Sequence, residues 1–239
     1  MNYADRFFFD LYPYIAGTIF LLGSLLRFER GQYTWSSDSS ELLRRGTLRW
    51  GSNLFHVGVL FLFSGHLVLL VPLSWLDAMA LSPPRHQILA IVSGLAFALI
   101  CLIGLLLLLH RRLSEPRIWA TTRPMDIVVL LWILLTLCFG AATTYYSAHE
   151  LSGSTLVALM AWAQHIAMFR GDAGEYVASV PWVYKIHMIL GMTLFVLIPF
   201  SRLVHIWSGF ALLSYLFRPY QIMRPRHPPD RPGSRISIN

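Results

Sequence analysis

The chain has 239 residues, of which 56% are hydrophobic and only 13% are charged, whereas about a quarter of an average soluble domain is charged. The net charge of +7 does not indicate a nucleic-acid-binding surface, because the basic residues lie between apolar runs and form no single patch. Composition therefore predicts an integral membrane protein.

Five apolar runs reach the length of about 20 residues that lets a helix cross a bilayer. The first run lacks the positive leader and the small-residue cleavage site of a signal peptide, so we expect it to remain as a span. Pro181 precedes the last run, at a helix start where the missing N–H of proline costs nothing. The predicted fold is an all-α bundle of five transmembrane helices, at about 5–27, 52–74, 88–109, 125–146 and 183–208.

The distribution of basic residues predicts the orientation of the bundle. Four basic residues lie on one side of the membrane: Arg6, Arg85, Arg170 and Lys185. Fourteen lie on the other side: Arg27, Arg30, Arg44, Arg45, Arg49, Arg111, Arg112, Arg117, Arg123, Arg218, Arg224, Arg226, Arg231 and Arg235. Since basic loops stay in the cytoplasm, we expect the N-terminus outside, in the periplasm, and the C-terminus in the cytoplasm.

Two segments lie outside the predicted spans. Residues 147–181, on the outer side, include apolar residues at helical spacing and are expected to hold an amphipathic helix at the membrane interface. Residues 221–239 form a basic, proline-rich cytoplasmic tail that we expect to be disordered, after a membrane domain at 1–220. Cys101 and Cys138 lie in apolar runs without a CxxC or CxxCH motif, and we interpret both as core thiols.

Four of the nine histidines lie inside predicted spans. His56 and His66 are on the second span, and His187 and His205 are on the fifth. An ionisable residue inside a membrane is a candidate for function, although a single such histidine more often makes only a hydrogen bond to a neighbouring helix. Two pairs on two helices favour a functional role.

The second and fifth spans run in opposite directions, so similar depth pairs His56 with His205 and His66 with His187. In continuous helices the first two would be roughly 15 Å apart and the last two roughly 27 Å, so no single metal ion could bind all four. Two haems, each held on both faces by one imidazole from each helix, fit this pattern. Helix tilt and a kink at Pro199 would absorb part of the unequal spacing.

A haem with two protein ligands has no open position for oxygen and can only pass electrons. Met188 and Met192 are alternative axial ligands, although methionines at helical spacing in an apolar helix usually pack in the core. Arg202, one turn before His205, is a candidate partner for a haem propionate, the alternative being a plain interfacial arginine. Three glycines beside the histidines would let a flat macrocycle approach the helix backbone: Gly58, Gly65 and Gly191.

Residues 7–34, the run SNLFHVGVLFLFSGH and the run HMILGMTLFVLIPFSRLVHIWS resemble the membrane cytochrome b (gamma) subunit of respiratory nitrate reductase, over most of the chain to about residue 220. In that family two b haems connect a quinol site near the outer face to an iron–sulfur subunit on the cytoplasmic side. The iron–sulfur subunit passes electrons to a molybdenum subunit that reduces nitrate. The resemblance implies that His56 and His205 hold the haem proximal to those partners, and that His66 and His187 hold the distal haem.

The resemblance also implies that menaquinol or ubiquinol is oxidised, with two protons released outside and two electrons sent inward. We expect the quinol site near Gly65, Arg85 and His86. The sequence departs here from the lysine typical of the family, which leaves the quinone type open. His86 is a candidate proton acceptor because the unperturbed pKa of histidine lies near 6.5, and the alternative is an interfacial histidine without a role.

Three other functions remain open at this stage. The first is a cytochrome b subunit of another quinone-linked oxidoreductase, of the hydrogenase or formate dehydrogenase type. The second is a haem-free transporter that uses the histidines as proton relays. The third is a structural membrane anchor. An absorption spectrum and the co-purifying partners would separate them.

Overall fold

The computed structural model describes residues 3–31 and 45–207. The expectations for Arg44 and for the tail at 221–239 lie outside the described residues. Residues Met1–His205 form one compact unit, and Ile206–Asn239 belong to a second. The five spans and all four intramembrane histidines lie in the first unit.

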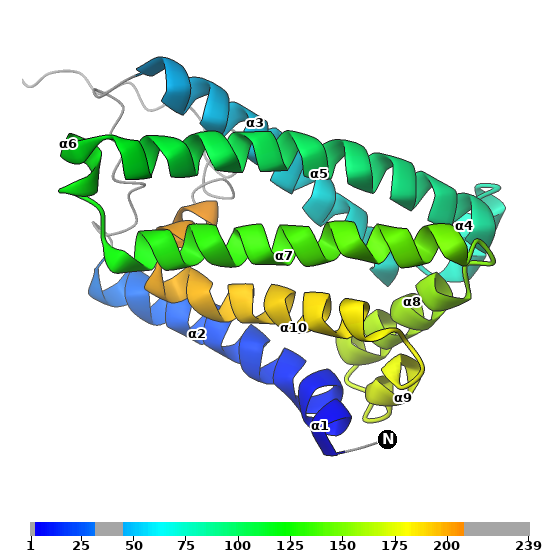
Figure 1. Cartoon of the computed structure of the whole chain (residues 1–239). Helices are drawn as coiled ribbons and strands as arrows, with labels where there is room; N and C mark the ends of the chain where they lie inside the picture. The colour runs from blue at the N-terminus through cyan, green and yellow to red at the C-terminus, as the bar shows by residue number, and fades with distance from the viewer. Residues whose placement is uncertain (1–2, 32–44, 208–239) are drawn as a thin grey trace, which may run out of the picture. The chain divides into compact units, whose positions relative to one another are not determined.

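All secondary structure in the described part of the chain is helical, and it includes five helices long and apolar enough to cross a membrane. The prediction of an all-α membrane protein with five spans is therefore confirmed, while its orientation stays a prediction. The spans are Tyr3–Arg30, Gly46–Leu70, Pro83–Ser114, Pro124–His149 and Trp182–Phe200 (Figure 1).

Each span is built from one or more helical elements. The first contains α1 (Tyr3–Arg6), a π-helix (Phe7–Leu11) and α2 (Tyr12–Arg30); the second contains α3 (Arg45–Leu67) and a 3₁₀ turn (Val68–Leu70). The third and fourth are α5 (Pro83–Ser114) and α7 (Pro124–His149), and the fifth contains α10 (Trp182–Leu197) and a 3₁₀ turn (Ile198–Phe200). Short helices connect them: α4 (Leu73–Ala78), α6 (Pro116–Trp119), α8 (Ser154–Ala167) and α9 (Ala173–Val177).

The fifth span does not continue as an α-helix to residue 208, so that expectation is wrong. The α-helix ends at Leu197, Ser201 is extended (φ −125°, ψ −180°), and a second 3₁₀ segment, η5, runs from Arg202 to His205. Pro199 lies in this break, where its missing N–H and its ring oppose a regular helix. The spacing of roughly 27 Å between the two histidines of this span assumed a continuous helix and no longer applies.

The second and third spans cross closely because small residues lie at their contact. A Cβ added at Gly58 would lie 2.6 Å from the Cα of Cys101, and one added at Gly104 would lie 2.8 Å from the carbonyl oxygen of Gly51. Gly58 therefore packs against α5, and our expectation that it admits a macrocycle is wrong. Around the crossing, Phe55, Cys101 and neighbouring leucines form a core cluster.

Most of the apolar surface of the spans faces outward, as expected for helices surrounded by lipid. No more than 33% of the most apolar window of any of the five spans is buried within the chain. Cys138 is exposed on α7, so our interpretation of it as a core thiol is wrong, whereas Cys101 is buried. The sequence places both cysteines in predicted spans but does not show which face of its helix each cysteine occupies.

The segment between the fourth and fifth spans holds α8 and α9, at the same end of the unit as the N-terminal helix (Figure 1). Trp162 of α8 donates its indole N–H to the carbonyl oxygen of Phe9 in the π-helix, at 2.9 Å. Gln164 donates to the carbonyl oxygens of Leu69 and Val71, at 3.3 and 3.0 Å. These bonds satisfy carbonyl groups where regular α-helix is interrupted, and they tie α8 to the ends of two spans.

The start of α8 is stabilised by a carboxylate. Glu150 accepts hydrogen bonds from the hydroxyls of Ser152 and Ser154, the second at 2.6 Å, and from the backbone N–H of Ser154. These bonds, that of Ser152 first, hold the pKa of Glu150 at about 2, well below its usual range. The carboxylate is therefore ionised at neutral pH, beside the positive end of the helix dipole of α8.

Candidate functional site

The structure brings the four histidines together in two pairs, one joining α3 to α10 and the other joining α3 to η5. The Nε2 atoms of His66 and His187 face each other at 3.4 Å, and their ring centroids are 5.7 Å apart. The rings of His56 and His205 have centroids 6.0 Å apart. His56 and His66 are exposed and the other two are partly buried. These are the same pairs that depth along antiparallel spans predicts.

The chain holds every one of these rings by its Nδ1 atom. On α3, Nδ1 of His56 lies 2.7 Å from the carbonyl oxygen of Ser52, and Nδ1 of His66 lies 2.7 Å from that of Leu62. Nδ1 of His187 lies 3.0 Å from the carbonyl oxygen of Thr136, and Nδ1 of His205 lies 2.7 Å from that of Arg202. A carbonyl oxygen can only accept, so each Nδ1 carries the proton and donates it. The Nε2 atom of each neutral ring is then left with its lone pair, which is the state that binds a metal ion.

The two Nε2 atoms can share a hydrogen bond only when one of the two rings is protonated, because two neutral rings that donate through Nδ1 present two lone pairs to each other. A metal ion between the two nitrogens would accept both lone pairs. Two imidazole–metal bonds of about 2 Å each would place the nitrogens about 4 Å apart. The distance of 3.4 Å between His66 and His187 is close to that requirement. Two facing imidazole nitrogens are a donor set that fits a metal with two protein ligands and its remaining ligands from a cofactor.

Helix α7 supplies two contacts to His187 that sequence reasoning missed. The carbonyl oxygen of Thr136 accepts the Nδ1 proton, and Gly140 lies one turn further along the same face. A Cβ added at Gly140 would lie 2.8 Å from Cε1 of the ring. The absent side chain therefore lets the imidazole lie against the backbone of α7. The sequence signal was a glycine four residues after a threonine in an otherwise apolar span, which is too common to be read without the structure.

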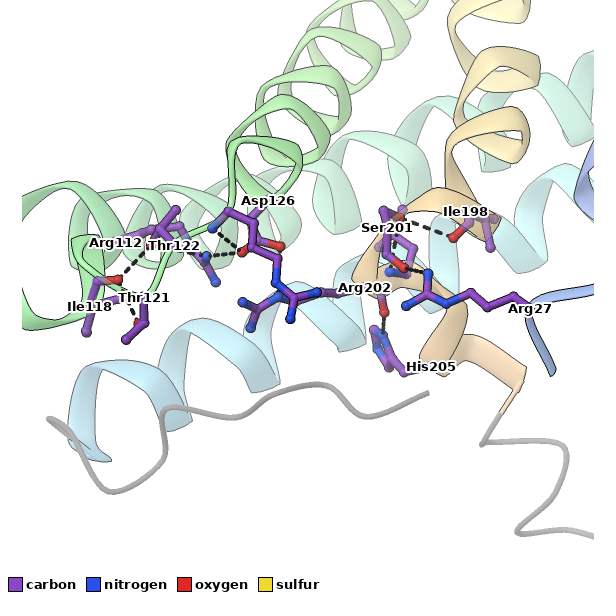
Figure 2. Close-up of polar contacts among 12 residues, drawn as sticks. Arg27, Arg112, Ile118, Thr121, Thr122, Asp126, Ile198, Ser201, Arg202 and His205 are labelled. Carbon is purple, nitrogen blue, oxygen red and sulfur yellow. Dashed lines mark hydrogen bonds and ion pairs between the residues drawn. The ribbon is translucent and has the colours of Figure 1, made fainter. Parts of the chain in front are cut away.

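A buried carboxylate joins α5, α7 and η5 near His205 (Figure 2). The side chain of Asp126, at the start of α7, is only 4% exposed and forms ion pairs of 2.8 Å with Arg112 of α5 and Arg202 of η5. It also accepts the backbone N–H of Arg123 at 3.1 Å. Sequence reasoning named Arg202 but not its partner. The signal was the isolated aspartate in the otherwise apolar run PMDIVV.

Among the described residues, no hydrogen bond or ion pair joins the three quinol-site candidates. Gly65 is exposed, with no atom within 4 Å of an added Cβ. Arg85 is exposed and donates to the carbonyl oxygen of Ala80 at 3.2 Å. His86 is buried in the first turn of α5, and its Nδ1 atom has no hydrogen-bond partner within the described ranges. Of the two alternative axial ligands, Met188 packs against a core cluster and Met192 is buried.

The fold and these pairs define a multi-pass α-helical membrane protein with two facing pairs of histidines between its second and fifth spans. Residues 5–226 match the family described as nitrate reductase gamma subunit. The chain is 44% identical to the respiratory nitrate reductase 1 gamma chain of Escherichia coli (strain K12), over 95% of this chain and 100% of that protein. It is 35% identical to the nitrate reductase gamma chain of Bacillus subtilis (strain 168), over 93% and 99% of the two chains.

The chain therefore belongs to the family of nitrate reductase gamma subunits, as its resemblance to that family implied. Members of this family are subunits of an oxidoreductase complex, and this chain is a multi-pass protein of the bacterial inner membrane. The family result decides against the alternative of a hydrogenase or formate dehydrogenase subunit.

Proposed function

We propose that this chain is the di-haem cytochrome b subunit of a respiratory nitrate reductase, which takes electrons from quinol and passes them to cytoplasmic partners. The observation that carries the proposal is the state of the four histidines. Each uses Nδ1 to bond a backbone carbonyl, and the Nε2 atoms of His66 and His187 face each other at 3.4 Å. Membership of the nitrate reductase gamma subunit family supplies the acceptor, nitrate, through the partner subunits.

In this proposal His66 and His187 hold the distal haem b, and His56 and His205 hold the proximal one. A haem with two axial imidazoles supplies one-electron transfer and no oxygen chemistry. The protein residues fix the ligands: the carbonyl oxygens of Leu62 and Thr136 orient the distal pair, which makes the ligating nitrogens more basic. Gly140 leaves room for the ring of His187.

We propose Arg202 as a partner for a propionate of the proximal haem. The cluster of Arg112, Arg202 and Asp126 holds two positive charges against one negative charge. Arg202 lies three residues before His205, so its positive charge is close enough in the chain to neutralise a propionate, which is costly to bury alone. Asp126 holds the guanidinium of Arg202 through Nε, and this contact orients its remaining N–H groups.

Quinol oxidation is proposed at the end of the bundle that carries α8 and α9. Oxidation of one quinol to a quinone releases two electrons and two protons, so the site needs a proton acceptor. His86 is the candidate, since its Nδ1 atom is buried without a hydrogen-bond partner among the residues described. Gly65 and Arg85 complete the proposed site, and either menaquinol or ubiquinol is the substrate.

The proposed partners are an iron–sulfur subunit and a molybdenum subunit, which receive electrons on the cytoplasmic side. The basic residues there favour docking of a soluble protein. Arg117 is exposed in α6, whereas Arg112 is already paired with Asp126. Arginines such as Arg117 are therefore the ones available to a partner.

The test is to replace one histidine at a time in the intact complex and to count the haems. His66→Ala or His187→Ala should remove the distal haem and abolish quinol oxidation. His56→Ala or His205→Ala should leave the distal haem reducible by quinol but stop nitrate reduction. The exposed His110 provides the matched control, and His110→Ala should keep both haems. Two retained haems in the His66 or His187 variant, or a wild-type complex whose membrane subunit holds no haem, would contradict the proposal.

A further inference from the structure

The irregular segment that carries His205 needs support that it cannot provide itself. Where α10 ends at Leu197, the N–H of Ile198 still bonds the carbonyl oxygens of Leu194 and Phe195, and the N–H of Ser201 bonds that of Ile198. The carbonyl oxygens of Pro199 and Ser201, in the break itself, lie beyond the regular α-helical bonding pattern. Inside a membrane an unpaired backbone carbonyl costs several kcal/mol, because no water is present to bond it. Pro199 also contributes no N–H. An α-helix interrupted here therefore requires donors from another part of the chain.

Arg27 of α2 supplies these donors. Its Nη1 atom donates to the carbonyl oxygen of Pro199 at 2.7 Å and to that of Ser201 at 2.6 Å (Figure 2). Gly23, one turn earlier on the same face of α2, lies directly against the proline ring. A Cβ at Gly23 would be 2.9 Å from Cβ of Pro199. On α2, the absent side chain of Gly23 therefore leaves room for the ring of Pro199, and Arg27, one turn later, bonds the carbonyl groups of the break.

The segment fixed by Arg27 leads directly to His205. Ser201 is buried, and its hydroxyl accepts the backbone N–H of Leu203 at 3.2 Å. Val204 is fully buried, and Nδ1 of His205 bonds the carbonyl oxygen of Arg202. A continuous set of contacts therefore links the guanidinium of Arg27 to the orientation of the His205 ring.

We propose that Arg27, seated by Gly23, is the positioning residue for His205 and hence for the proximal haem. This inference rests on the proposed function, since it assumes that His205 binds iron. Positive charge at the cytoplasmic end of a span would by itself account for an arginine here. The two hydrogen bonds to the break give Arg27 a second role. Among the described contacts, no other arginine at this end of α2 makes such bonds.

The test compares Arg27→Met with Arg30→Met, which removes an exposed arginine from the same last turn of α2. In the purified complex, Arg27→Met should lose or shift the low-spin ferric EPR signal that His56→Ala and His205→Ala also remove. The signal of the distal haem should stay. Arg27→Lys should restore part of the proximal signal, because an ammonium group can also donate to both carbonyls. Arg30→Met should resemble the wild type.

A second pair of variants covers the case in which Arg27→Met fails to assemble. Gly23→Ala should disturb the same EPR signal, whereas Gly17→Ala, which meets no atom within 4 Å, should not. Hydrogen exchange at the amides of Ser201 and Leu203 provides a measurement that does not depend on haem. It should become at least about tenfold faster in Arg27→Met, as expected for the loss of one charge-assisted hydrogen bond.

Equal haem signals and equal exchange rates in Arg27→Met and Arg30→Met would overturn the inference and leave the proposed function intact. A wild-type subunit without haem would refute the proposed function, and the exchange measurement would still decide whether Arg27 holds the segment.

Discussion

Asp126 is the residue on which the polar contacts at one end of the bundle depend. It pairs with two arginines from two other elements, although its own side chain is almost completely buried. A buried carboxylate is tolerated only when it is paired and hydrogen-bonded, and both conditions hold here. Removing the negative charge would leave Arg112 and Arg202 close together without their common partner.

Asp126→Asn should therefore destabilise the protein by about 3 kcal/mol, the lower limit for breaking a buried ion pair, because the two arginines are 20% and 22% exposed. For a chain of this length that loss corresponds to a fall of about 6–12 °C in Tm. Thermal unfolding of the purified subunit in detergent would measure it. Asp77→Asn, at an exposed aspartate of α4, is the control and should leave the Tm unchanged. Equal Tm values for the two variants would contradict the assigned role of Asp126.

At the scale of elements, close contact between α3 and α5 matters because α3 carries two of the four histidines. Glycines at the crossing let the helix backbones approach, with Gly58 against Cys101 and Gly104 against Gly51. Phe55, the neighbour of His56, is part of the core cluster at this contact. The position of His56 therefore depends on how closely these two helices approach.

Gly58→Ala should separate the helices, since the new Cβ would meet the backbone of Cys101 at 2.6 Å, and backbone atoms cannot rotate away. We expect a loss of about 1–3 kcal/mol, as for other overpacked sites. Gly94→Ala, in α5, is the control: its new Cβ meets no atom within 4 Å, so it should be neutral or stabilising by up to about 1 kcal/mol. Parallel thermal unfolding of both variants would measure the difference. An unchanged Tm for Gly58→Ala would contradict the prediction and would show that α3 and α5 can move apart at little cost.

At the scale of the whole chain, the paired histidines divide the described unit into two functional ends. The end with α8 and α9 holds the His66–His187 pair, and the end with α6 holds the His56–His205 pair and the Asp126 cluster (Figure 1). The bias of basic residues predicts that the α6 end faces the cytoplasm. The proposed electron flow toward cytoplasmic partners requires this orientation.

Labelling with a membrane-impermeant maleimide would test the orientation. Cysteine introduced at Gly171, between α8 and α9, should react in intact spheroplasts, and cysteine introduced at Arg117 should react only in inverted vesicles, because each position is exposed. The wild-type chain, whose two cysteines lie within spans, provides the background. The opposite labelling pattern would place quinol oxidation on the wrong side and would require the proposal to be revised.

The amino-acid sequence by itself determined that this is a five-span helical membrane protein, because length and apolarity decide what can cross a bilayer. It also determined which histidines can meet, since antiparallel spans of known depth allow only one pairing. The sequence resemblance named the family in advance. All of these properties depend on position along the chain, which a sequence states directly.

Only the tertiary structure decided how the histidines are held. The break after Leu197, the room beside Gly140 and the pairing of Arg202 with Asp126 all depend on neighbours from distant segments. Gly58 illustrates the limit, because a glycine beside a histidine suits a cofactor or a helix crossing equally well. Which of the two it serves depends on the helix that packs against it, and local sequence does not specify that helix.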